Sequence, residues 1–209
     1  MNESLLKDEA QARAFCETLS DTSAIERLDR FAELLLEENR RQNLISRSSE
    51  GFLWLRHMAD SAQLLLHVPR ETSGPWLDLG TGAGFPGLVI AALRPEMRVI
   101  LVESRARRIA FLERMCKELS LVHCVVEGKR LELVEPFEAG VISARAFAPL
   151  PKLLSLSASF STSSTTYLLP KGRSAAQECA QLPKRRRAMF HVEQSVTDAE
   201  AGIIVGKGG

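Results

Sequence analysis

The feature that most constrains this sequence is a glycine-rich segment between a short apolar run and an apolar helical stretch. Residues 77–87 read LDLGTGAGFPG, with glycines at alternate positions from Gly80 to Gly84. Because glycine has no Cβ, the chain can turn sharply here and a ligand can approach the backbone closely. Pro86 suits the first turn of a following helix. In an open parallel sheet such a loop lies beyond the carboxyl ends of the strands, where ligands bind.

Short apolar segments alternate with helical ones throughout the chain after Pro75. This alternation predicts an α/β fold with a mainly parallel sheet and helices on both faces. The expected strands are 76–79, 99–102, 122–126, 140–143, 166–169 and 203–205, and the expected helices are 86–93, 105–119 and 150–157. The later half of the Ser/Thr-rich run 155–166 predicts a surface loop.

The N-terminal third has a helical pattern instead. Leu28, Phe31, Leu34 and Leu35 recur at spacings of three and four, as one face of a helix requires. Asp21 or Thr22 is the expected N-cap of this helix. A second helix is expected over 52–67, with a polar and partly irregular segment over 39–50. We therefore expect a helical extension in residues 1–70 and a ligand-binding domain in residues 71–209.

Composition and charge exclude several classes of protein. The four cysteines, at positions 16, 116, 124 and 179, form no C-x-x-C pair, so we expect no metal site and no disulfide framework. No apolar run approaches the roughly 18 residues of a membrane span. The first ten residues are acidic and lack a basic region, which favours a cytoplasmic protein over a secreted one.

The net charge is only +1, but the basic residues are unevenly distributed. One cluster holds Arg105, Arg107 and Arg108, and a second runs from Lys184 to Arg187. Such clusters are most often solvated faces. The alternative, which we keep open, is that they contact the phosphates of a nucleic acid.

Two ligand classes use a glycine loop of this kind. A dinucleotide requires G-x-G-x-x-G, and the frame from Gly82 to Gly87 satisfies that spacing. However, D-L-G-x-G-x-G resembles the first motif of S-adenosylmethionine-dependent methyltransferases. The carboxylate of Asp78 suits a ligand that carries a sulfonium and an amino group and no phosphate. Glu103, which ends the next expected strand, can accept hydrogen bonds from the ribose hydroxyls of either ligand.

Six segments, in order and at similar spacing, resemble one family, the bacterial small-subunit rRNA guanine-N7 methyltransferases, also called glucose-inhibited division protein B. The match covers residues 43–172. The segments are Asn43-Leu44-Ile45, residues 57–61 (HMADS), the glycine loop with Phe85-Pro86-Gly87, Glu103-Ser104 with Arg108 and Phe111-Leu112, residues 143–146 (SARA), and residues 169–172 (LPKG). The Ser/Thr-rich stretch before Thr166 lacks the family's Pro-Gly turn, and the tail after Lys171 matches only loosely.

The resemblance implies a Rossmann-like class I methyltransferase fold, with a seven-stranded sheet in 71–209. It implies transfer of a methyl group from S-adenosylmethionine to N7 of a guanine (position 527 type) in 16S rRNA, on free RNA or the small ribosomal subunit. We further expect a monomer without metal. The expected cofactor contacts, from the resemblance and from the motifs above, are Gly80, Gly82, Phe85, Glu103, Leu131, Glu132 and Arg145.

Guanine N7 has an in-plane lone pair and no proton, so the reaction needs alignment rather than a general base. Arg145 and Lys171 are the candidate catalytic residues, directed at O6 or at phosphates. His57 and Asp60, three residues apart on a predicted helix, are either an acid–base pair or a structural hydrogen bond that closes the extension onto the sheet.

Three other functions remain alternatives. A nicotinamide-dependent oxidoreductase would use Tyr167 and Lys171 as its proton relay. A small-molecule methyltransferase would share the cofactor motif. A non-catalytic RNA-binding module would need stacked aromatic residues and a basic face, yet aromatic residues are only 6% of the chain.

Overall fold

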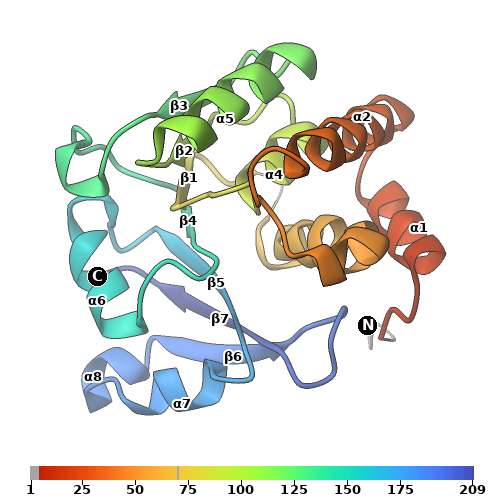
Figure 1. The fold of residues 1–209 in the computed structure, drawn as a ribbon. Helices are drawn as coiled ribbons and strands as arrows, with labels where there is room; N and C mark the ends of the chain where they lie inside the picture. The colour runs from red at the N-terminus through yellow and green to blue at the C-terminus, as the bar shows by residue number, and fades with distance from the viewer. Residues whose placement is uncertain (1–4, 70) are drawn as a thin grey trace.

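The structure, a computed structural model, describes residues 5–69 and 71–209, which form a seven-stranded sheet between two layers of helices (Figure 1). The strand order is β3-β2-β1-β4-β5-β7-β6, and the first five strands are parallel. β7 is antiparallel to both of its neighbours. The strands are β1 Trp76–Leu79, β2 Val99–Val102, β3 Cys124–Glu127, β4 Val141–Ser143, β5 Thr166–Gly172, β6 Phe190–Gln194 and β7 Gly202–Lys207.

This sheet confirms the predicted α/β fold and all six predicted strands, although β3 starts two residues later than expected. β6, the seventh strand, was not found from the residue pattern. It is the outermost strand on one side of the sheet, and all five of its side chains are exposed or half-buried, so it carries little of the apolar signal that marks an inner strand.

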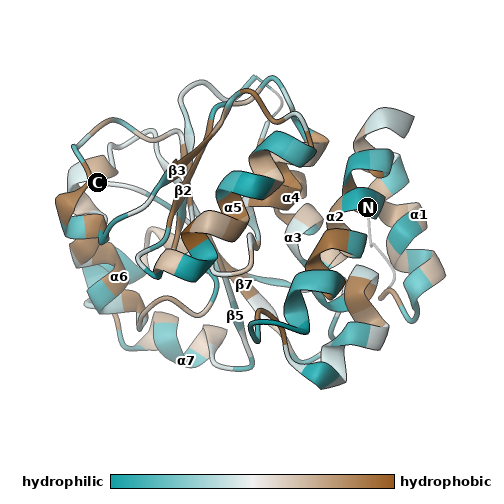
Figure 2. Cartoon of the chain, turned by 45° about the horizontal axis from the view of Figure 1, so that its top comes forward, coloured by the Kyte–Doolittle hydropathy of each residue, from teal (hydrophilic) through white to brown (hydrophobic). Residues whose placement is uncertain are grey.

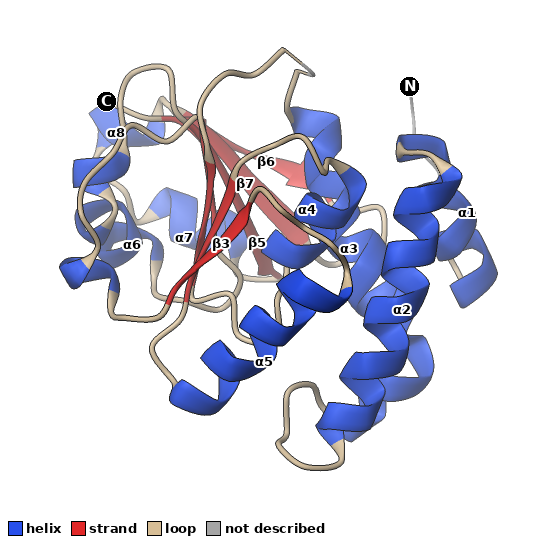
Figure 3. Cartoon of the chain, turned by 90° about the horizontal axis from the view of Figure 1, so that it is seen from above, coloured by secondary structure: helices blue, strands red, loops and turns tan. Residues whose placement is uncertain are grey.

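Helices cover both faces of the sheet, as the sequence predicts (Figure 3). α4 and α5 lie on one face together with the N-terminal extension, and α6 and α7 lie on the other. Apolar residues line the inner side of each layer (Figure 2). The helices of the sheet region are α4 Gly87–Leu93, α5 Ala106–Glu118, the 3₁₀ turns η4 Leu131–Leu133 and η5 Ala158–Phe160, α6 Leu150–Leu156, α7 Ala175–Ala180 and α8 Lys184–Arg187.

The N-terminal extension comprises α1 (Glu9–Leu19), α2 (Thr22–Asn39) and an irregular helical stretch. Asp21 is the N-cap of α2, because its side chain accepts a hydrogen bond from the Ala24 amide. Phe31 and Leu28 of α2 share one hydrophobic core with the α4 face of the sheet. The expected boundary between extension and sheet region falls at residue 70, which lies outside the described residues, as do residues 1–4.

The predicted helix over 52–67 is helical but not regular. It consists of η1 (Arg47–Phe52, 3₁₀), η2 (Trp54–Ala59, π-helical), α3 (Asp60–Ala62) and η3 (Gln63–His67, 3₁₀). π-Helical turns are rare and occur often at functional sites. This one carries His57 and leads directly into Asp60.

The topology separates the two basic clusters. Arg105 follows β2 at the carboxyl edge of the sheet, by which we mean the side where the parallel strands end and the glycine loop lies. β7 runs the other way, so Gly202 pairs with Gly172 at that edge and Lys207 pairs with Thr166 at the opposite one. α8 precedes β6, whose first residue pairs near the end of β7. Lys184–Arg187 therefore lies at the edge opposite to the glycine loop. Within the described part of the chain, no helix is long and apolar enough to cross a membrane.

Candidate active site

The glycine loop connects β1 to α4 in a conformation that requires glycine. Gly80, Gly82 and Gly84 have φ angles of 65°, 60° and 100°, which L side chains rarely adopt. A Cβ on Gly80 would lie 2.6 Å from Cδ2 of Phe147. At Gly82 the nearest atom, on Arg108, would be 3.5 Å away. Gly80 is thus more tightly surrounded than Gly82.

Asp78 holds the glycine loop from inside the protein. It is fully buried, and its Oδ2 accepts a hydrogen bond from the Gly87 amide at 3.0 Å. Its Oδ1 accepts one from Ser143 of β4 at 2.7 Å. Burial raises the pKa of this carboxyl. The interpretation that Asp78 itself meets a charged cofactor group does not fit this placement, because both oxygens are used to join the loop to β4.

Four of the expected cofactor residues line one cavity of about 270 Å³ at the carboxyl ends of β1 and β2. They are Gly80, Glu103, Leu131 and Glu132. Oε1 of Glu103 accepts hydrogen bonds from the amides of the two residues that follow it, at 2.7 and 2.9 Å. Its Oε2 lies 3.5 Å from Nη1 of Arg108. The carboxylate is therefore fixed on the cavity wall, with one oxygen only loosely paired.

The same cavity includes residues that the sequence did not reveal. Lys129, Lys152 and Phe147 also line it. Lys129 follows Gly128, just after the end of β3. A sheet prediction can use this position, because it places Lys129 at the carboxyl ends of the strands. Phe147 has no such signal, because it lies in an irregular segment after β4 and reaches Gly80 only through the tertiary fold.

The other three expected cofactor residues lie outside this cavity. Gly82 is in the loop but does not line it. The Phe85 side chain is buried, 1% exposed, with its ring 4.9 Å from the His57 ring and 5.4 Å from Phe31. Arg145 does not line the cavity, and it places its guanidinium 4.9 Å from the Phe85 ring centroid. A role of the Phe85 side chain is therefore to support Arg145.

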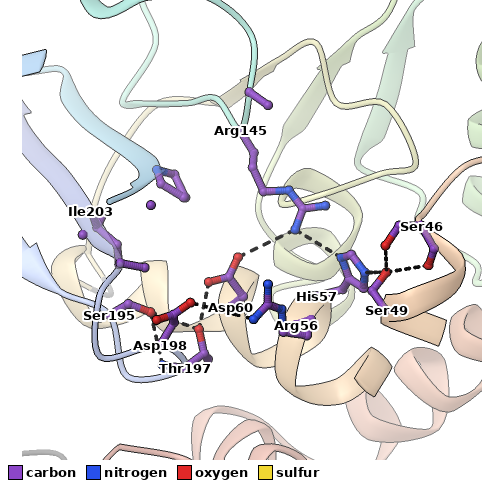
Figure 4. A pocket seen from close by; sticks show the side chains of 15 residues that line it. Ser46, Ser49, Arg56, His57, Asp60, Arg145, Ser195, Thr197, Asp198 and Ile203 are labelled. Carbon is purple, nitrogen blue, oxygen red and sulfur yellow. Dashed lines mark hydrogen bonds and ion pairs between the residues drawn. The ribbon is translucent and has the colours of Figure 1, made fainter. Parts of the chain in front are cut away.

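Arg145 is the centre of a polar network between the extension and the sheet (Figure 4). Its Nη1 lies 3.3 Å from Nδ1 of His57 and 3.7 Å from Oδ2 of Asp60. Ala146, the next residue, has a φ of 54°, so the turn that directs Arg145 is strained and must be held by its surroundings. The network lines a cavity of about 400 Å³ between the extension and the loop that joins β6 to β7.

His57 and Asp60 do not bond to each other; each contacts Arg145. Nε2 of His57 pairs with the Ser49 hydroxyl at 3.0 Å. Burial, with Arg145 and Arg56 nearby, lowers the pKa of His57 to about 3. A neutral ring accepts from Arg145 at Nδ1 and donates to Ser49 at Nε2. Of the two sequence interpretations, this geometry favours the structural one, with Arg145 as the link.

The lowered pKa of His57 predicts how the free energy of unfolding depends on pH. Between about pH 6.5 and pH 3 the unfolded chain binds a proton at this histidine and the folded chain does not, so folding weakens as the pH falls. We expect the free energy of unfolding of the wild type, relative to His57→Gln, to drop by about 1.4 kcal/mol between pH 7.5 and 5.5. Urea denaturation of both proteins at several pH values measures this difference. A constant difference would show that His57 titrates normally.

Arg145 also lines a second, open hollow of about 740 Å³, together with Lys171. Phe147 and Ala148 line both this hollow and the 270 Å³ cavity, so the two adjoin. Lys171 is firmly held: its side chain is 7% exposed, and Nζ donates to the Ala148 carbonyl at 2.6 Å and pairs with Glu178 at 3.0 Å. The structure thus brings both candidate catalytic residues to one hollow, with Arg145 far more accessible than Lys171.

The proton relay of the oxidoreductase alternative is not formed. Tyr167 is buried, and its hydroxyl lies 3.0 Å from that of Ser157 in the core beneath α6. Lys171 points instead to the hollow. Among residues 5–69 and 71–209, no group of three His, Cys, Asp or Glu side chains is arranged to hold a metal.

Comparison with known proteins assigns the chain to a family. The family described as rRNA small subunit methyltransferase G matches residues 24–203. The chain is 59% identical to "Ribosomal RNA small subunit methyltransferase G" of Erythrobacter litoralis, over 98% of each chain. The chain belongs to the rRNA small subunit methyltransferase G family. A protein of the same name from Sphingopyxis alaskensis is 52% identical over 98% of this chain and 88% of its own length.

Solved structures confirm the fold that membership in this family implies. A precorrin-6y C5,15-methyltransferase from Geobacter metallireducens superposes with a TM-score of 0.55 over 80% of this chain and 92% of its own, at 12% identity. At that identity the likeness concerns the fold alone. The predicted Rossmann-like methyltransferase fold is therefore confirmed.

Proposed function

We propose that this protein transfers a methyl group from S-adenosylmethionine to N7 of a guanine in 16S rRNA. The observation that carries the proposal is the pair of adjoining cavities at the carboxyl edge of the sheet. One has the glycine loop and Glu103 on its walls, the other has Arg145 and Lys171, and Phe147 borders both. Membership in the rRNA small subunit methyltransferase G family supports the rRNA substrate.

The residues of the 270 Å³ cavity fit the proposed cofactor. Glu103 offers a fixed carboxylate oxygen to ribose hydroxyls, and Leu131 offers an apolar wall to a base. Gly80 leaves room that a Cβ would fill. Gly82 shapes the loop, and Glu132 borders the opening. When bound, S-adenosylmethionine supplies an electrophilic methyl group on a sulfonium.

Arg145 and Lys171 are proposed to act on the guanine side. The loosely paired guanidinium of Arg145 offers a planar set of donors to O6 or a phosphate. Lys171 is held too firmly for direct contact to be its main role. It fixes the Ala148 carbonyl, and thereby the segment that carries Phe147. No base is needed, since N7 carries no proton, and the neutral His57 is consistent with that chemistry.

The finer features of the assignment are proposals as well. We infer a cytoplasmic protein that acts as a monomer, without metal, on 16S rRNA or the small ribosomal subunit. We retain the division into an extension of residues 1–70 and a methyltransferase domain of residues 71–209. The two parts share a core, so we expect neither to fold alone.

Methyl transfer from tritiated S-adenosylmethionine tests the proposed function. The acceptors are 16S rRNA and small subunits from cells that lack the enzyme, followed by mapping of the modified base. We expect one labelled guanine, methylated at N7. Label on another base or position, or transfer only to small molecules, would replace the proposed substrate.

The position of the two basic clusters predicts different contributions to RNA binding. The sequence leaves open that both contact phosphates, but of the two clusters only the first lies at the glycine-loop edge. Arg108 is paired with Glu103 there, so we expect Arg105 and Arg107 to contact a short RNA. Replacing both by Gln should lower the slope of log affinity against log salt by about 1.4 to 1.8 units. Reversing the charges of Lys184–Arg187 is the matched control on the opposite edge. If only the charge-reversed Lys184–Arg187 variant changed the slope, the RNA would bind at the opposite edge instead.

A further inference from the structure

We propose that Asp60, from the N-terminal extension, is a positioning residue for methyl transfer that acts by aiming Arg145 at the substrate. The inference deepens the proposed function and rests on it. Asp60 is not itself placed to touch the cofactor, because it lines the 400 Å³ cavity and not the 270 Å³ cavity that Gly80 lines.

The two oxygens of Asp60 have separate partners. Oδ1 accepts hydrogen bonds from the Thr197 hydroxyl and the Gln63 amide, both at 3.0 Å. Oδ2 lies 3.7 Å from Nη1 of Arg145 and is therefore left for the ion pair. The carboxylate is thus oriented from one side by the extension and the loop after β6, and it presents its charge to Arg145 on the other.

Arg145 needs such support because its side chain is long and leaves β4 by a strained turn. Three groups limit where its guanidinium lies: the Asp60 charge, Nδ1 of His57 and the face of Phe85. Asp60 is the only one of the three that carries a charge opposite to that of Arg145. All of the contacts to Asp60 and His57 use Nη1. Nε and Nη2 form no hydrogen bond with any described residue, so these two donors remain for the substrate.

The loop between β6 and β7 becomes part of the site through the same contact. Thr197 donates to Asp60 and also bonds with Ser195, which is in turn bonded to Gln63 of the extension. Two segments that are 137 residues apart in the sequence therefore orient one carboxylate. This explains why a helical extension outside the sheet lies against the reaction centre.

The test is a double-mutant cycle between Asp60→Asn and Arg145→Ala, measured by single-turnover methyl transfer with cofactor and RNA saturating. Asn keeps the shape of Asp60 and removes its charge. We expect Asp60→Asn to lower the rate about tenfold in the wild type, and less than about twofold in the Arg145→Ala background. Cofactor affinity, measured by calorimetry, should stay within about twofold, since Asp60 lies outside the cofactor cavity.

Two further variants separate positioning from stability. Thr197→Val removes the hydroxyl that orients Oδ1 and should lower the rate about threefold, with the full effect again absent beside Arg145→Ala. Asp198→Asn is the matched control. Asp198 lines the same cavity but pairs with Arg56 at 3.8 Å, so its variant should keep the wild-type rate.

Each outcome decides the inference. An unchanged rate in Asp60→Asn, or an equal loss with and without Arg145, overturns it, as does a loss shared by Asp198→Asn. A slow Arg145→Ala beside a fully active Asp60→Asn leaves the proposed function standing and removes this inference alone. Full activity in Arg145→Ala overturns this inference and the role assigned to Arg145, and leaves methyl transfer to 16S rRNA standing. No methyl transfer to 16S rRNA by the wild type overturns the proposed function as well.

Discussion

Gly80→Val is expected to weaken the binding of S-adenosylmethionine at least a hundredfold, or about 2.7 kcal/mol. Gly80 has a φ of 65°, which a β-branched residue adopts only with strain. Its Cβ would also lie 2.6 Å from Phe147, so the aromatic ring would have to move. Because Phe147 lines the cofactor cavity, any such movement changes the space that the cofactor needs. Calorimetric titration of the folded variant measures the effect.

Gly172→Val is a matched control for the backbone strain alone. Its φ of 57° is almost the same, but nothing lies within 4 Å of the position of a Cβ. This variant should lose stability in a thermal melt and keep its affinity for the cofactor. Gly82→Val, with its nearest neighbour at 3.5 Å, should lie between the two. Unchanged cofactor affinity in a well-folded Gly80→Val would show that the glycine loop is not the site.

Arg145→Ala is expected to lower single-turnover methyl transfer about ten- to a hundredfold. This is the loss of one charge-assisted hydrogen bond of about 1.5–3 kcal/mol that acts on the transition state. Arg145→Lys should recover little, because an ammonium group cannot form the planar contacts of a guanidinium. Cofactor affinity distinguishes this role from the cofactor contact that the family resemblance implies. A purely catalytic arginine leaves that affinity unchanged, whereas a cofactor ligand lowers it.

Lys171→Ala provides the comparison within the same hollow. We expect it to lower both the melting temperature and the turnover, since it removes the bond to Ala148 and leaves Glu178 without its cationic partner. Adding Glu178→Ala should restore part of the stability without restoring turnover. If Arg145→Ala retains full turnover while Lys171→Ala does not, the two assignments must be exchanged.

The sequence by itself determined the features whose cause is local. A strand, a turn that needs glycine and a helix follow one another within residues 76–93, and each is encoded by its own residues. The alternation of such units predicted the sheet, and its topology then placed Gly80 and Glu103 near one edge. Leu131 and Glu132 were expected there only from the family resemblance. α1 was missed because only Ala12 and Cys16 are buried in it, which leaves a weak apolar pattern.

Only the tertiary structure decided how Arg145 is surrounded. His57, Asp60 and Phe85 come from the extension and the glycine loop, 60 to 88 residues away in sequence, and no local pattern records that they meet. The same holds for Phe147 over Gly80 and for the placement of Lys184–Arg187 at the opposite edge, which depends on the antiparallel direction of β7. Spacing in sequence fixes which face or edge a residue occupies, but contacts between distant segments arise from how the shared core packs.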